Sequence, residues 1–218
     1  MALDIEVLSK QDIKPSVPTP QHLKKYSISF LDHIAPRVFI PLIFYYTAID
    51  KDKNNLKFDH LKKSLSEALT KFYPLASRFI DNAHVYCNDD GAHYVEARVD
   101  CNLKDIIRDP IPNELIKLLP LEVDDAAVDE SLLGAVISHK LADGLSCVNF
   151  MTTWAPIARG EPNVPSPILD LVKLFPPLDI SGFEDRIGIL KENIICKRFV
   201  FDATKDMTQP TRFEAVLT

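Results

Sequence analysis

Hydrophobic residues at helical spacing mark the clearest element of the chain. Leu61, Leu65, Leu69 and Phe72 recur every three or four residues, and lysines occupy many of the positions between them. This repeat places the apolar side chains along one face of a helix. The pattern predicts an amphipathic helix that ends before Pro74.

Alternating and continuous apolar runs predict strands. Tyr26, Ile28 and Phe30 alternate with serines, which is the period of a half-buried strand. We expect this strand to end at Asp32. The longest apolar run, 38–49, contains a proline and is shorter than the roughly 20 residues of a membrane-spanning helix, so it predicts a buried strand.

A turn is expected between two further strand-like runs in the segment 84–99. Asp89, Asp90 and Gly91 separate the runs, and these residue types tolerate the backbone conformations of tight turns. The segment predicts a β-hairpin.

A continuous apolar run, 131–138, leads to His139 and predicts a strand that is buried on both faces. Helical spacing returns after Gly144, where the recurring apolar residues are Leu145, Val148, Met151 and Ala155. Trp154 lies beside this stripe, and we expect Pro156 to strain or end the helix. His139 therefore lies on a connection between a strand and a helix.

The remaining segments are divided by prolines. A short helix is predicted at 113–120, and residues 161–196 have the composition of a long crossover loop with one helical turn near 168–174. A further strand is predicted at 196–202. Strands interleaved with helices favour an α/β layered domain.

The composition is that of a folded globular protein, because 46% of the 218 residues are hydrophobic. The formal net charge is −6, so nucleic acid is not an expected partner. The acidic opening MALDIEVLSK differs from an export signal, and the sequence has no apolar run long enough to span a membrane. We therefore expect a cytoplasmic protein without a membrane partner.

Neither the cysteines nor the scattered histidines suggest a metal site. The cysteines are Cys87, Cys101, Cys147 and Cys196, and their spacing contains no CxxC pair. Reduced, buried thiols are therefore expected. The histidines other than His139 are His22, His33, His60, His84 and His93. None pairs with a cysteine or carboxylate at ligand spacing, so we predict no metal and no bound cofactor.

The segment AVISHKLADGLS offers the best candidate chemistry. A neutral His139 held at the end of a strand can remove a proton from a hydroxyl that attacks a carbonyl. Asp143 could orient the loop through a hydrogen bond or an ion pair. Residue spacing by itself favours a structural alternative, in which Asp143 caps the helix that starts near Gly144 and His139 is a core residue.

The segment SHKLADG resembles the HxxxDG motif of the plant BAHD acyltransferases. Other matching segments occur in the family's order: TPQHLKKYSISFLD, IPLIFYY, LKKSLSEALTKFYPLASR, YCNDDGAHYVEAR, LFPPLD and KRFVFD. Together they make the resemblance specific. Their residues are most similar to those of the alkaloid-acetylating branch of the family.

The resemblance implies an acyltransferase with His139 as general base and Asp143 as a structural residue, turned away from the substrate and often paired with an arginine elsewhere. Acyl-CoA, with acetyl-CoA as first choice, would be the co-substrate and a small-molecule alcohol such as an alkaloid the acceptor. We expect the protein to be a monomer. Which residues bind coenzyme A is not predicted.

The implied fold is a chloramphenicol-acetyltransferase-like α/β architecture of two lobes. By the resemblance, residues 1–202 form the first lobe, with 161–196 as its crossover loop, and 203–218 begin a truncated second lobe. The family's DFGWG motif is missing from the chain. About one hairpin arm is also missing before the motif at His139. An alternative function is therefore an inactive fragment or splice product that retains only ligand or partner binding.

Overall fold

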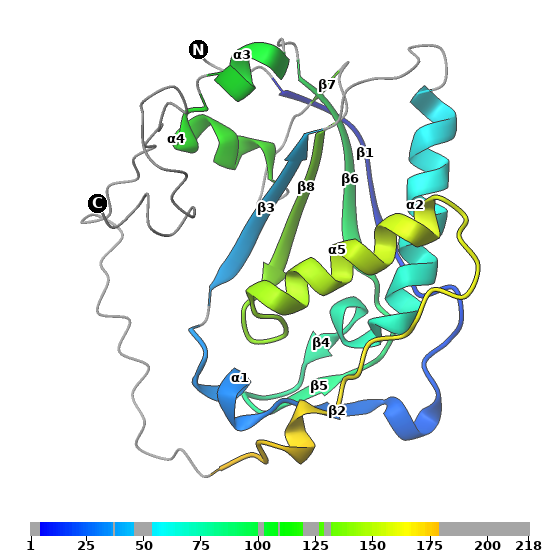
Figure 1. Ribbon diagram of the computed structural model, residues 1–218, viewed down its shortest axis with the longest axis vertical. Helices are drawn as coiled ribbons and strands as arrows, with labels where there is room; N and C mark the ends of the chain where they lie inside the picture. The colour runs from blue at the N-terminus through cyan, green and yellow to red at the C-terminus, as the bar shows by residue number, and fades with distance from the viewer. Residues whose placement is uncertain are drawn as a thin grey trace, which may run out of the picture. The chain divides into compact units, whose positions relative to one another are not determined.

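The computed structural model describes residues 5–36, 38–45, 54–99, 103–108, 110–119, 127–128 and 132–178 (Figure 1). Its strands are β1 (Ile5–Ile13), β2 (Lys25–Ser27), β3 (Phe39–Tyr45), β4 (Arg78–Phe79), β5 (His84–Tyr86), β6 (Ala92–Val99), β7 (Ala127–Val128) and β8 (Leu132–Ser138). Its α-helices are α1 (Phe30–Ile34), α2 (Asn54–Lys71), α3 (Leu103–Arg108), α4 (Pro112–Leu115) and α5 (Gly144–Ala158). Single 3-10 turns form η1 (Gln21–Leu23), η3 (Tyr73–Ala76), η4 (Ile116–Leu118) and η5 (Leu171–Lys173).

The described strands form three separate hydrogen-bonded groups, in the orders β1-β6-β7, β2-β5-β4 and β3-β8. β1 and β6 are antiparallel, as are β3 and β8, whereas the short β7 runs parallel to β6. In Figure 1, α5 crosses in front of β8 and β6. Side chains of both strands reach the same apolar core, so the strands lie under a shared helical layer.

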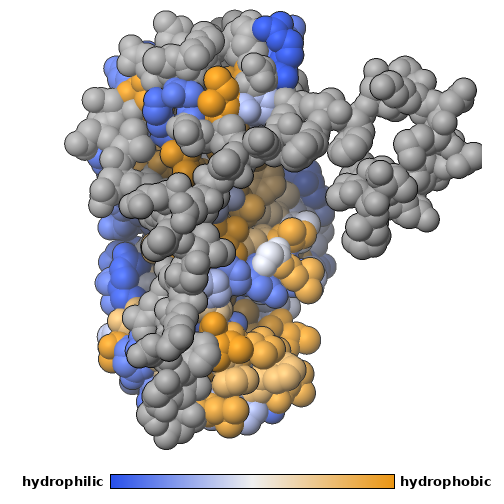
Figure 2. Space-filling view, turned by 90° about the vertical axis from the view of Figure 1, so that its left-hand side faces the viewer, coloured by the Kyte–Doolittle hydropathy of each residue, from blue (hydrophilic) through white to orange (hydrophobic). Residues whose placement is uncertain are grey.

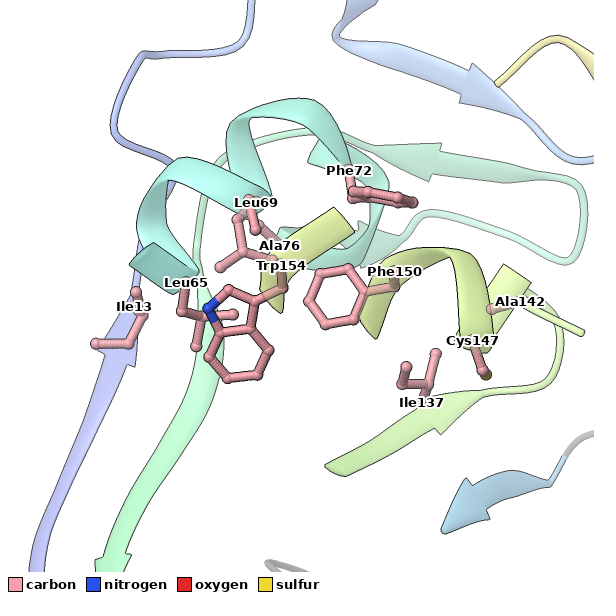
Figure 3. Close-up of a cluster of buried hydrophobic side chains, with 11 residues drawn as sticks. Ile13, Leu65, Leu69, Phe72, Ala76, Ile137, Ala142, Cys147, Phe150 and Trp154 are labelled. Atoms are coloured by element: carbon pink, nitrogen blue, oxygen red, sulfur yellow. The ribbon is translucent and has the colours of Figure 1, made fainter. Parts of the chain in front are cut away.

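The core is built around the contact between α2 and α5. Leu65 and Leu69 of α2, with Phe72 directly after it, pack with Phe150 and Trp154 of α5, and we call these five residues the helix-pair core (Figure 3). The Phe72 and Phe150 rings meet edge to face with centroids 5.2 Å apart. The Trp154 indole donates to the Ser64 hydroxyl at 2.9 Å, which satisfies its buried N–H.

The predicted helix after Gly144 is confirmed, but the apolar stripe that marked it in the sequence is not its most buried face. Cys147, Phe150 and Trp154 are buried, whereas Leu145 is 73% and Val148 57% exposed. Each buried position lies one residue before a position of the stripe that marks the helix in the sequence. One residue corresponds to about 100° of rotation about the helix axis. This helix has apolar residues on most sides, so residue spacing alone could not show which side is buried. Burial of the larger aromatic rings decided the orientation of the helix.

The predicted strand ending at Asp32 is correct only as far as Ser27. β2 stops there, and α1 begins at Phe30. Ser29 caps this helix, because its hydroxyl accepts the Asp32 N–H and the Asp32 carboxylate accepts the Ser29 N–H. This capping box stabilises the helix start and overrides the alternating pattern.

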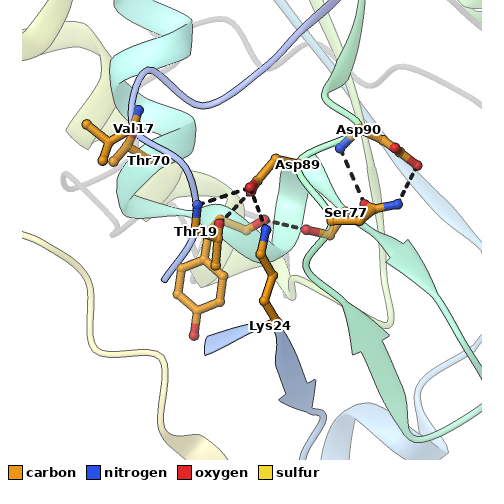
Figure 4. Close-up of polar contacts among 9 residues, drawn as sticks. Val17, Thr19, Lys24, Thr70, Ser77, Asp89 and Asp90 are labelled. Atoms are coloured by element: carbon orange, nitrogen blue, oxygen red, sulfur yellow. Dashed lines mark hydrogen bonds and ion pairs between the residues drawn. The ribbon is translucent and has the colours of Figure 1, made fainter. Parts of the chain in front are cut away.

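The predicted hairpin is also wrong, although both of its strands exist. β5 pairs with β2 and β4, and β6 pairs with β1 instead of β5. The intervening turn has positive φ at Asp89 (61°) and Gly91 (106°). Asp89 then accepts hydrogen bonds from the Thr19 hydroxyl and from Lys24, which fixes the chain before β2 against the turn (Figure 4).

Other predictions stand in part. α2 ends before Pro74, α4 with η4 occupies the predicted short helix, and η5 is the predicted turn in the crossover loop. β3 and β8 are strands but are half-buried instead of fully buried, and Phe39 is 62% exposed. The predicted strand 196–202 and the expected lobe boundary lie outside the described residues. No helix in the described part of the chain is long and apolar enough to cross a membrane.

Candidate active site

His139 is the first residue after β8, and its backbone is fixed to the neighbouring strand. The His139 N–H donates to the carbonyl of Val38 at 2.9 Å, one residue before β3 begins. The next turn is closed by the Leu141 and Ala142 N–H groups, which both donate to the Ser138 carbonyl at 2.9 and 3.1 Å. We call residues 139–143 the His139 turn.

The imidazole of His139 is half-buried and has two unlike nitrogens. Nδ1 is shielded from solvent and has no hydrogen-bond partner among the described residues. With Nδ1 shielded, the ring nitrogen that would have to meet a substrate is Nε2. A ring that keeps one nitrogen accessible meets the geometric requirement for a general base.

Asp143 caps α5, as the structural alternative from the sequence predicted. Its carboxylate accepts the Ser146 N–H at 2.7 Å. Hydrogen bonds from Ser146, with a smaller contribution from the charge of His139, lower the pKa of Asp143 below its ordinary value. No ion pair to Asp143 occurs among the residues that the structure describes, so the arginine partner implied by the resemblance is not found there. Asp143 thus orders the turn through α5.

Lys140 is a further residue of the turn, and sequence reasoning missed it. Its side chain is buried, and Nζ donates to the His33 carbonyl at the end of α1 at 2.9 Å. The turn is therefore attached to α1 as well as to β3 and α5. A lysine directly after a candidate base, inside an otherwise apolar segment, was the available signal.

Exposed apolar side chains flank the His139 turn. Val38 and Phe39 lie on the β3 side, and Leu145 and Val148 on the first turns of α5. Figure 2 shows apolar surface collected on the side of the molecule that carries α1 and the start of α5. A hollow of about 340 Å³ lies elsewhere, beside the end of α2, and its lining includes no residue of the turn.

Two other histidines of the described residues are paired with carboxylates. His93 contacts Asp12 and His84 contacts Asp81, both through Nδ1 at 3.0 Å. Cys87 and Cys147 are buried free thiols whose pKa values are raised by burial, which opposes thiolate formation. No group of three potential metal ligands occurs within the described ranges.

Comparison with known proteins identifies the family. Residues 3–182 match the model of the transferase family. Vinorine synthase of Rauvolfia serpentina is 39% identical over 94% of this chain and 53% of its own length. Stemmadenine O-acetyltransferase of Catharanthus roseus is 35% identical, with the same coverage of each chain. The limonoid 21-O-acetyltransferase of Melia azedarach is 34% identical over 98% of this chain and 57% of its own length.

The crystal structure of vinorine synthase matches the fold with a TM-score of 0.73 and 36% identity, over 81% of this chain and 48% of that one. The chain therefore belongs to the transferase family of BAHD acyltransferases. The expected chloramphenicol-acetyltransferase-like α/β fold is confirmed. The chain spans about half the length of the relatives it matches.

Proposed function

We propose that this chain carries the general base of an acyl-CoA-dependent O-acyltransferase, with His139 in that role. The observation that supports the proposal is the placement of His139, whose backbone is fixed at a strand end while the residue is only half-buried. Two of the relatives are O-acetyltransferases by name. We therefore assign acetyl-CoA as donor and a hydroxyl of a plant specialised metabolite, such as an alkaloid, as acceptor.

The proposed reaction uses one proton and one acyl group. Nε2 of neutral His139 takes the proton of the acceptor hydroxyl while the oxygen attacks the thioester carbonyl. Collapse of the tetrahedral intermediate breaks the C–S bond. The imidazolium then gives its proton to the coenzyme A thiolate, which restores the neutral base. Asp143 and Lys140 hold the turn and do not contact the reactants. We propose that the enzyme works as a cytoplasmic monomer.

A second candidate is a chain that binds ligand or partner without turnover. Two observations favour it for the 218 residues alone. Apolar side chains beside His139 are exposed, so the described residues do not exclude water from the base. Among the described strands, the sheet beneath the turn is also divided into separate groups.

The decisive experiment measures free thiol released from acetyl-CoA in the presence of an alkaloid alcohol panel. The chain is assayed alone and after co-expression with the part of vinorine synthase that lies beyond the match. We expect release from the co-expressed pair, and a loss of about 10²–10⁴-fold with His139→Ala. His93→Ala, which removes an exposed histidine of β6, is the matched control and should retain activity. Activity that survives His139→Ala would overturn the proposal, and inactivity of the pair would favour the second candidate.

A further inference from the structure

One short sequence pattern, in which a hydroxyl residue lies between two prolines and follows a valine, occurs twice in the chain. It reads VPTP at 17–20 and VPSP at 164–167. Proline fixes its own φ and pushes the residue before it into an extended conformation, so both segments are extended by their own sequence. A serine or threonine directly before proline is the acceptor that proline-directed protein kinases modify. The sequence alone therefore offers such a kinase two equivalent acceptors, Thr19 and Ser166.

The structure makes Thr19 a poor acceptor. Thr19 is only 6% exposed. Its hydroxyl donates to one carboxylate oxygen of Asp89 at 2.5 Å, and its N–H donates to the other at 3.0 Å (Figure 4). A phosphate on this hydroxyl would lose the bond to Asp89 and would bring two negative groups together. Thr19 is therefore both covered and electrostatically unsuited to modification.

Ser166 lies in the opposite environment. It is exposed, and residues 164–170 form neither helix nor strand. Figure 1 shows this part of the chain, drawn in yellow, as it leaves the end of α5 and passes α2. The Oγ of Ser166 accepts a hydrogen bond at 3.1 Å from Nζ of Lys71, the last residue of α2. A kinase can therefore reach Ser166, and a cation already contacts the atom that would be modified.

Two carboxylates share the surroundings of Lys71. Glu67, one turn earlier on α2, and Glu161 line the same hollow of about 340 Å³ as Lys71. Glu161 is already paired with Arg159 at 2.6 Å. Neither carboxylate is a hydrogen-bond partner of Ser166 in the described chain. Attraction to a cation in direct contact outweighs repulsion from exposed carboxylates farther away, because water and salt screen the longer interactions.

We propose that Ser166 is a modification site, phosphorylated by a proline-directed kinase, and that Lys71 holds the phosphate. The Ser166 Oγ attacks the γ-phosphorus of ATP, and the bond from this phosphorus to the oxygen of ADP breaks. ADP leaves with the electron pair of that bond, and the hydroxyl proton passes to the catalytic aspartate of the kinase. The single hydrogen bond from Lys71 is then replaced by an ion pair with the phosphate, which fastens the segment 164–167 to α2.

The first experiment compares the two acceptors within one folded chain. The purified chain is incubated with ATP and a purified mitogen-activated protein kinase, and tandem mass spectrometry locates and quantifies the phosphate. Synthetic peptides of residues 13–24 and 160–171 supply the rates of the same two acceptors without the fold. Relative to its own peptide, Ser166 in the chain should react about a hundredfold faster than Thr19, because Thr19 must first be released by local unfolding.

Ser166→Ala should remove the phosphate from the folded chain. Ser16→Ala, which changes an exposed serine that no proline follows, is the matched control and should leave the rate unchanged. Equal relative rates at Thr19 and Ser166 would overturn the proposal. So would a 160–171 peptide that is not modified, or one that is modified while Ser166 in the folded chain is not.

The second experiment tests Lys71 without any kinase. Phosphoserine is placed at position 166 by genetic code expansion, and ³¹P NMR follows the ionisation of the phosphate with pH. Contact with Lys71 favours the dianion, so the pKa of the phosphate should be lower in the chain than in the phosphorylated 160–171 peptide. Lys71→Met should raise this pKa to the value of the peptide. Lys63→Met, which changes an exposed lysine two turns earlier on α2, should not.

A phosphate pKa equal to or above that of the peptide would mean that Glu67 and Glu161 outweigh Lys71, and it would overturn the proposal. A lowered pKa that Lys71→Met leaves unchanged would do the same. Acetyl transfer enters none of these readouts, so this proposal and the proposed function fail separately.

Discussion

The helix-pair core and the His139 turn differ in how they are held. In the core, buried apolar side chains enclose one another, and the Trp154 N–H has its partner in Ser64. The turn is held by backbone and cap hydrogen bonds on one side, while its apolar neighbours are exposed. The buried apolar contacts are therefore concentrated between the helices, and the candidate base lies beside exposed apolar side chains. Changes in the core should reduce stability most, and changes around the turn should have smaller, more local effects.

Trp154→Ala should produce the largest effect. It removes a buried ring and leaves the Ser64 hydroxyl without its donor, so the free energy of unfolding should fall by about 3–5 kcal/mol. Urea denaturation followed by circular dichroism measures the change. Trp154→Phe keeps an aromatic ring and loses the hydrogen bond, and should lower stability by about 1–2 kcal/mol. Equal losses for the two variants would show that the core does not depend on the ring.

Gly134→Ala tests the strand that leads to the turn. A Cβ at Gly134 would lie 2.9 Å from the Leu118 carbonyl oxygen, so η4 or β8 must shift. We expect a loss of about 1–3 kcal/mol in the free energy of unfolding, which is typical of overpacking. Gly144→Ala is the matched control, because nothing lies within 4 Å of its Cβ, and it should not destabilise the chain. If both substitutions were neutral, β8 would be loosely packed against η4.

The same contrast explains which parts of the fold the sequence could predict. α2 was predictable because one face is apolar and the other carries lysines, so only one orientation buries the apolar side chains. α5 is apolar on most sides, and its buried face depended on the partner helix. The strand pairing of β5 and β6 depended on β2 and β1, which lie far away in sequence. Local turn residues such as Asp89 could not reveal those partners.

The residues of the candidate site could be predicted from the sequence, but their contacts could not. His139 and Asp143 could be found because a histidine follows an apolar strand and a carboxylate precedes a helix. Spacing left the role of Asp143 open, and the capping bond to Ser146 shows one of its contacts. The link from Lys140 to His33 joins residues 107 positions apart, so no local pattern could predict it.

Lys140→Met should destabilise the turn by a smaller amount than the changes in the core. Methionine keeps the apolar stem but leaves the His33 carbonyl without the bond from Nζ, and we expect a loss of about 1–2 kcal/mol. Amide hydrogen exchange at His139 and Leu141 should become faster, while exchange in α2 stays unchanged. Lys140→Arg retains a donor and should show less effect. Equally faster exchange in α2 would indicate that the turn and the helix-pair core unfold together.

Asp143→Ala should have the smallest effect on the free energy of unfolding. The pH dependence of this effect distinguishes stabilisation by the capping hydrogen bond from stabilisation by the charge of the carboxylate. Loss of an N-cap should lower the free energy of unfolding by about 1 kcal/mol at neutral pH. The pKa of Asp143 is lowered in the folded chain, so its stabilising contribution is complete above the unfolded value of about 3.9 and is lost as the pH falls through the lowered folded-state pKa. Urea denaturation from pH 7 downward should therefore show the two chains converging in acid. Asp143→Asn can cap without a charge, so its advantage over Asp143→Ala should persist at low pH. If the asparagine variant were no more stable than the alanine variant at any pH, the capping hydrogen bond would contribute nothing. The stabilisation by Asp143 would then come from its charge, acting on His139 and on the helix dipole.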